Sequence, residues 1–137
     1  MDFLDRKGEV ARLDGLVKRK VAGLAALWGR RRVGKSRLLM EWCARNGGVY
    51  TVADLSAAPV QRRYFADAVA AALPGFNEAE YPDWGVLLRR LASDARSHGW
   101  RGPLIVDEFP YLVMGDPALP SVFQNWVDRE RETNGLL

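Results

Sequence analysis

The chain has very little cysteine and histidine: its 137 residues include one of each, Cys43 and His98. A single cysteine cannot form a disulfide within the chain, so we expect a cytoplasmic protein in a reducing compartment. The longest apolar run, residues 21–28, is too short to cross a bilayer, and the charged N-terminus is unlike a signal peptide. These shortages argue against secreted disulfide scaffolds, cysteine/histidine metal sites and membrane proteins.

The chain also lacks a large excess of charge of one sign. It has 20 Lys and Arg residues against 17 Asp and Glu residues, which gives a formal net charge of +3. This excess permits an anionic ligand such as a nucleotide, but it does not by itself indicate nucleic acid. The hydrophobic fraction of 48% is ordinary for a packed core, and we expect one domain over residues 1–137.

Helical and extended patterns alternate along the chain, which is typical of an α/β protein with a parallel sheet. We expect helices over residues 9–20, from 35 to a stop at 46–48, and over 60–73, 83–98 and 121–131, with strands over 24–28, 49–53 and 104–106. Because residues 104–106 are wholly apolar, we expect that strand to be buried on both faces. In the helix over residues 60–73, the spacing puts Val60 and Tyr64 on the buried side.

The strongest motif lies between the strand expected at residues 24–28 and the helix that follows it. It reads Gly29-Arg30-Arg31-Arg32-Val33-Gly34-Lys35-Ser36 and matches the phosphate-binding pattern G-x-x-x-x-G-K-[ST]. The glycines let the backbone wrap around phosphate oxygens, and the first N–H groups of the helix point at the same anion. We expect the segment from Gly29 to Arg37 to bind the nucleotide, with Lys35 on the β- and γ-phosphates and Ser36 as a ligand of Mg²⁺.

A pair of acids follows the last apolar strand. Residues 104–106 lead into Asp107 and Glu108, which puts two carboxylates at the carboxyl edge of the sheet, where α/β proteins bind ligands. We expect Asp107 to hold Mg²⁺ through water, and Glu108 to orient or deprotonate an attacking water. Without the phosphate-binding motif, a simple acidic junction between strand and loop would be an equally good interpretation.

Together these residues resemble the prokaryotic and archaeal AAA-like P-loop ATPases related to the STAND group. The resemblance rests on residues 3–6, 9 and 13, on residues 28–36 and on residues 106–112, and it extends over essentially the whole chain. It implies a P-loop NTPase fold, with three α/β/α layers around a parallel sheet, and Mg²⁺-dependent binding and hydrolysis of ATP in the intact family member. Lys35 and Glu108 would then serve catalysis, and residues 3–6 would lie near the adenine.

The resemblance also implies a longer protein, in which a sensor strand, an arginine finger and a helical lid follow the residues seen in this chain. We therefore expect an N-terminal part of the ATPase domain, with weak or no hydrolysis by itself and a tendency to associate through open sheet edges. A nucleotide-gated switch, a DNA-associated ATPase and a small-molecule kinase stay open as alternatives. A homo-oligomer is a further alternative. The role of Arg30, Arg31 and Arg32 is also left open: they either strengthen the positive field over the phosphates or form a solvated loop face.

Overall fold

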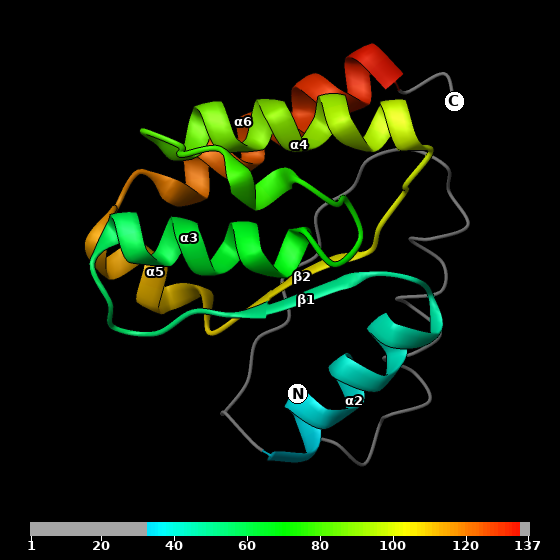
Figure 1. Cartoon of the computed structure of the whole chain (residues 1–137). Coiled ribbons are helices and arrows are strands. Elements are labelled where there is room, and N and C mark those ends of the chain that lie inside the picture. The colour runs from blue at the N-terminus through cyan, green and yellow to red at the C-terminus, as the bar shows by residue number, and fades with distance from the viewer. Residues whose placement is uncertain (1–32, 135–137) are drawn as a thin grey trace.

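The computed structural model describes residues 33–134, so the expected helix 9–20 and strand 24–28 lie outside the described residues. The helices are α2 (Val33–Arg45), α3 (Ala58–Val69), α4 (Trp84–His98), α5 (Phe109–Gly115) and α6 (Leu119–Asn134), with a short 3-10 helix η2 (Phe76–Glu78). The strands are β1 (Val49–Val52) and β2 (Leu104–Asp107), which pair in parallel (Figure 1). The prediction of a mixed α/β protein with a parallel sheet is therefore confirmed.

The two strands end at the same edge of the sheet. Val49 lies opposite Leu104 and Val52 lies opposite Asp107. A tight turn joins α2 to β1, and in it the N–H of Gly48 donates to the carbonyl of Cys43 at 2.9 Å. Helix α2 consequently runs back against the direction of the strands, on the other side of the sheet from α3 and α4 (Figure 1).

Side chains alternate between the two faces of the sheet, as the two-residue period of a strand requires. On the face covered by α2, Tyr50 and Ile105 pack against the buried side chains of Leu39 and Trp42. The opposite face belongs to a larger core. The buried side chains of this main core are those of Val49, Ala53, Phe65, Ala66, Val69, Leu73, Phe76, Trp84, Leu87, Leu88, Leu91, Leu112, Leu119 and Phe123.

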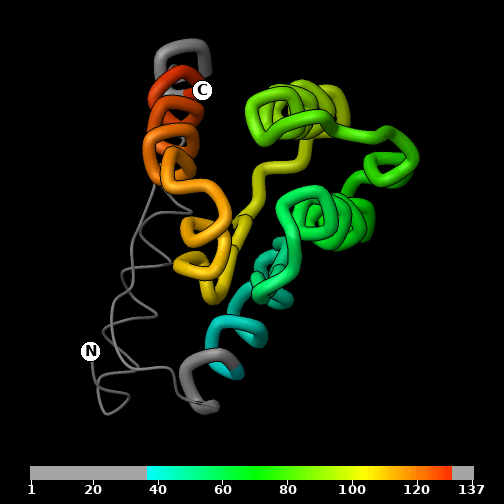
Figure 2. Tube along the Cα trace, turned by 90° about the vertical axis from the view of Figure 1, so that its left-hand side faces the viewer, coloured from blue at the N-terminus to red at the C-terminus, as the bar shows by residue number. Residues whose placement is uncertain are grey.

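The helices of the main core are held together by aromatic contacts. The ring of Trp84, at the start of α4, lies 5.3 Å from that of Phe65 in α3 and 5.9 Å from that of Phe123 in α6. Helices α4 and α6 run side by side (Figure 2), and an ion pair of 2.7 Å between Arg96 and Glu130 also joins them. Trp84 therefore links three helices, and the main core supports the sheet from one side.

Helix α3 differs from the expected helix in both its ends and its buried side. It spans Ala58–Val69 rather than residues 60–73, because turn hydrogen bonds replace the helix from Ala70 onward. The expected inward positions of Val60 and Tyr64 are wrong, since these side chains are 39% and 45% exposed. The amide of Gln61 takes the inward position instead and is 4% exposed, because it binds the loop that precedes the helix.

Strand β2 and helix α5 also depart from the expectations. The strand packs on both faces, with Leu104 and Val106 against the main core and Ile105 against α2, but all four of its residues are only half-buried, so the expected full burial is met in part. Within residues 33–134 the strand has one neighbouring strand, β1, which explains its partial exposure. No helix was predicted over Phe109–Gly115; α5 has Pro110 in its first turn, where proline is tolerated because no N–H is needed there.

The beginning of α4 carries a side-chain cap that provides a test of local stability. Asp83 precedes the helix, and one carboxylate oxygen accepts a hydrogen bond of 2.8 Å from the N–H of Val86. We expect Asp83→Ala to lower the free energy of unfolding by about 1 kcal/mol, because an N–H group of the first turn loses its partner. Urea unfolding would measure the change. Asp83→Asn keeps an acceptor and should cost much less; an equal loss in both variants would contradict a capping role.

Candidate functional site

The phosphate-binding motif lies only partly within the described residues. Gly29, Arg30, Arg31 and Arg32 are outside them, whereas Val33, Gly34, Lys35 and Ser36 form the first turn of α2. The helix predicted to follow the motif is therefore present. Because α2 runs against the strands, its first turn is directed towards the carboxyl end of the sheet (Figure 1).

Arg37 is the last residue of the segment expected to bind nucleotide. Its Nε lies 3.2 Å from Oε1 of Glu41, one helical turn further on, and both side chains are largely exposed. Such an exposed pair contributes at most a few tenths of a kcal/mol to stability, so it has little structural importance. The guanidinium is directed along the helix surface, and a contribution of Arg37 to phosphate binding would come from its backbone N–H.

Asp107 and Glu108 lie where the sequence predicted them, at the carboxyl end of β2. Asp107 is the last residue of the strand, and its carbonyl accepts a hydrogen bond of 2.9 Å from the N–H of Ala53. One oxygen of its carboxylate, Oδ1, accepts a hydrogen bond of 2.9 Å from the N–H of Glu108. The other, Oδ2, accepts from the hydroxyl of Tyr50 on β1. The carboxylate is thus half-buried and held by two donors from different parts of the chain.

Glu108 has an unusual backbone conformation. Its φ of 59° lies in the left-handed region, and it is the one non-glycine residue with positive φ within residues 33–134. Such a conformation costs about 1 kcal/mol or more for a residue with a Cβ. Glu108 is the residue before α5, but its side chain makes no capping hydrogen bond. Residues with this kind of backbone strain cluster at functional sites.

Sequence reasoning missed Tyr50, the residue that binds the Asp107 carboxylate. The strand pattern predicted Tyr50 only as part of residues 49–53, and no local motif marks it. Its relation to Asp107 depends on the register of β1 and β2, in which Tyr50 lies opposite Ile105 and diagonal to Asp107. Diagonal neighbours in a sheet are within reach of aromatic side chains. Only the pairing of the two strands could have revealed this contact.

Sequence reasoning also missed the loop that follows β1 at the same sheet edge. The buried amide of Gln61 binds both backbone groups of Asp54, at the start of this loop: Nε2 donates to the carbonyl of Asp54, and Oε1 accepts from the N–H of Asp54 at 3.3 Å. The carboxylate of Asp54 accepts from the N–H of Ser56 at 2.8 Å, and hydrogen bonds with Ser56 lower the pKa of Asp54. Asp54, Leu55, Ser56 and Tyr111 of α5 line an open hollow at this edge.

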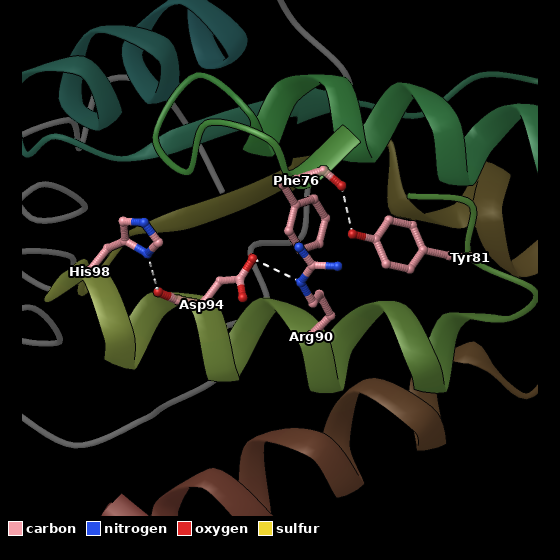
Figure 3. A network of polar contacts seen from close by, with 5 residues as sticks. All are labelled: Phe76, Tyr81, Arg90, Asp94 and His98. Atoms are coloured by element: carbon pink, nitrogen blue, oxygen red, sulfur yellow. Dashed lines mark hydrogen bonds and ion pairs between the residues drawn. The ribbon is translucent and has the colours of Figure 1, made fainter. Parts of the chain in front are cut away.

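The single histidine lies away from the carboxylate pair. His98 ends α4 and precedes β2, so it lies towards the opposite end of the strand from Asp107. Its Nδ1 lies 2.9 Å from the carbonyl oxygen of Asp94, and since a carbonyl only accepts, the ring nitrogen donates (Figure 3). Arg90 is paired with the Asp94 carboxylate at 3.0 Å in the same group. These contacts join residues on the surface of α4, so they indicate a structural role for His98.

Two further groups with shifted pKa values have structural roles. Burial raises the pKa of the Cys43 thiol, which is 1% exposed on the inner side of α2, as expected of a core residue. Burial also raises the pKa of the Tyr81 hydroxyl, which donates a hydrogen bond of 2.6 Å to the carbonyl of Phe76 (Figure 3). Neither group lies at the carboxyl edge of the sheet.

Residues 33–134 contain no group of three or more His, Cys, Asp or Glu side chains that could form a separate metal centre. None of the helices in this part of the chain is long and apolar enough to cross a membrane. Comparisons of the chain with protein-family models, with curated proteins and with solved structures give no match. The function proposed for the chain therefore rests on its own residues.

Proposed function

We propose that the chain binds ATP together with Mg²⁺, as the P-loop portion of an AAA-like ATPase domain with a three-layer α/β/α fold. One observation carries this proposal: Asp107 ends a parallel strand of the sheet that α2 covers, Glu108 follows it directly, and the first turn of α2 contains Gly34-Lys35-Ser36. A phosphate-binding helix and a pair of carboxylates from a neighbouring strand are the two parts that a P-loop site requires.

Each residue of the proposed site has a role that fits its chemistry. The N–H groups from Gly29 to Arg37 would surround the phosphates, and the ammonium group of Lys35 would bind the β- and γ-phosphates. The Ser36 hydroxyl and the Asp107 carboxylate supply the oxygen ligands that Mg²⁺ prefers, the latter through water. Bound Mg²⁺ would neutralise charge on the phosphates.

Glu108 is assigned to hydrolysis in the intact family member rather than to binding. Its carboxylate follows Asp107 directly, and its left-handed backbone sets it apart from the α5 helix that begins at the next residue. A carboxylate at this position would orient the attacking water or accept its proton. Since hydrolysis is assigned only to the intact family member, nucleotide binding is the property to test first.

A titration of the full chain with a fluorescent ATP analogue tests the proposal. We expect saturable binding that unlabelled ATP reverses, and tighter binding in Mg²⁺ than in EDTA, because the metal joins the phosphates to Ser36 and Asp107. Circular dichroism would show that the protein is folded under both conditions. If a folded, monodisperse chain did not bind the analogue in Mg²⁺, the proposal would be wrong.

A further inference from the structure

The hydrogen bond between Tyr50 and Asp107 can orient a carboxylate as well as join the two strands. The hydroxyl of Tyr50 donates to Oδ2 of Asp107, while the N–H of Glu108 donates to Oδ1. One donor on each oxygen fixes the orientation of the carboxylate. The Tyr50 bond crosses from one strand to the other, whereas the Glu108 bond is local.

The ring of Tyr50 is itself held in place by α2. It packs, together with Ile105, against Leu39 and Trp42, whose side chains are 5% and 3% exposed. An aromatic ring has two side-chain torsions, and packing on a helix leaves it little freedom. Tyr50 therefore connects α2, whose first turn contains Lys35 and Ser36, to the carboxylate that ends β2.

We propose that Tyr50 is a positioning residue for Mg²⁺: its hydroxyl orients the Asp107 carboxylate towards the metal and fixes it relative to α2. This inference rests on the proposed function. Tyr50 lies outside the phosphate-binding motif and the acidic pair, and its proposed role is to act through Asp107. Groups that hydrogen-bond a metal-binding carboxylate orient it and raise metal affinity, and their loss typically costs about 10- to 100-fold in metal affinity or activity.

The test removes only the hydroxyl and asks whether the loss depends on the metal. We expect Tyr50→Phe to weaken binding of the fluorescent ATP analogue about tenfold in Mg²⁺ and to leave binding in EDTA unchanged. In the Asp107→Ala background, Tyr50→Phe should cause no further loss, because the group that it orients is gone. Tyr64→Phe is the matched control, because Tyr64 lies on the exposed side of α3. This variant should bind the analogue like the wild type in both buffers.

Each outcome has a distinct meaning. An equal loss in Mg²⁺ and EDTA would show that the hydroxyl supports the fold rather than the metal, and would overturn the inference. Unchanged binding of Tyr50→Phe in Mg²⁺ would also overturn it, while the ATP-binding proposal would stand. If the wild-type chain did not bind the analogue, the proposed function and this inference would both fall. Thermal unfolding of each variant checks that the fold is retained.

Discussion

Replacement of Lys35 by alanine is expected to weaken ATP binding by about 100-fold or more. The ammonium group would make charge-assisted hydrogen bonds to the β- and γ-phosphates, and bonds to charged groups contribute about 1.5–3 kcal/mol each. Alanine keeps the helix and its N–H groups, so the substitution removes the phosphate contact and little else. Titration with the fluorescent analogue in Mg²⁺ would measure the loss.

The control for Lys35→Ala must separate a specific contact from a general loss of positive charge. Arg45 serves this purpose because it lies on the same helix, in the last turn of α2, with an exposed side chain. Arg45→Ala removes one positive charge at the opposite end of the helix from the proposed site. We expect its affinity to stay within about twofold of the wild type. A similar loss in both variants would argue against a phosphate contact by Lys35.

The second large effect concerns the turn between α2 and β1. A methyl group on Gly48 would lie 2.5 Å from the carbonyl oxygen of Pro103 and 2.7 Å from the sulfur of Cys43. The same carbonyl accepts a hydrogen bond of 2.8 Å from the N–H of Val49, next to the first pair of β1 and β2. Gly48→Ala must therefore push the helix end away from β2. We expect a loss of about 3 kcal/mol in the free energy of unfolding, measured with urea.

The neighbouring glycine provides the comparison for Gly48→Ala. Gly47 has a φ of +67°, but a methyl group there would meet no atom within 4 Å. Gly47→Ala should therefore cost about 1 kcal/mol, through backbone strain alone. The two substitutions add the same atom at adjacent positions, so their difference reports the steric clash. If the free energy of unfolding fell no more for Gly48→Ala than for Gly47→Ala, the turn would accommodate the added methyl group without a destabilising clash.

The sequence predicted best those elements whose signals are local. Helix α4 was expected over residues 83–98 and spans Trp84–His98, because Asp83 caps its start and Gly99 ends it in the left-handed conformation. The ends of α3 and the existence of α5 were harder to predict. Alanines after Val69 suit a helix as well as they suit the turns that follow it, and α5 has too few residues for a clear period.

The residues of the candidate site also divide into those that a local signal predicts and those that it does not. Asp107 and Glu108 could be predicted at the end of a strand, because an apolar run followed by acids is visible in the sequence alone. Tyr50 and Gln61 could not. The hydroxyl of Tyr50 meets Asp107 only through a register between strands, and Gln61 is buried only because backbone groups of Asp54 satisfy its amide. A polar residue at an inward helical position is normally read as a surface residue.

The parallel pairing of β1 and β2 has a consequence for the order of events during synthesis. All of residues 53–103 must leave the ribosome before β2 can meet β1, since Leu104 is the first residue of the second strand. Helices α3 and α4 can form from local contacts, but closing so long a loop is slow and entropically costly. The hydrogen bond from Tyr50 to Asp107 forms in that same late step. The pairing of β1 with β2 and the orientation of the Asp107 carboxylate by Tyr50 are thus one folding event.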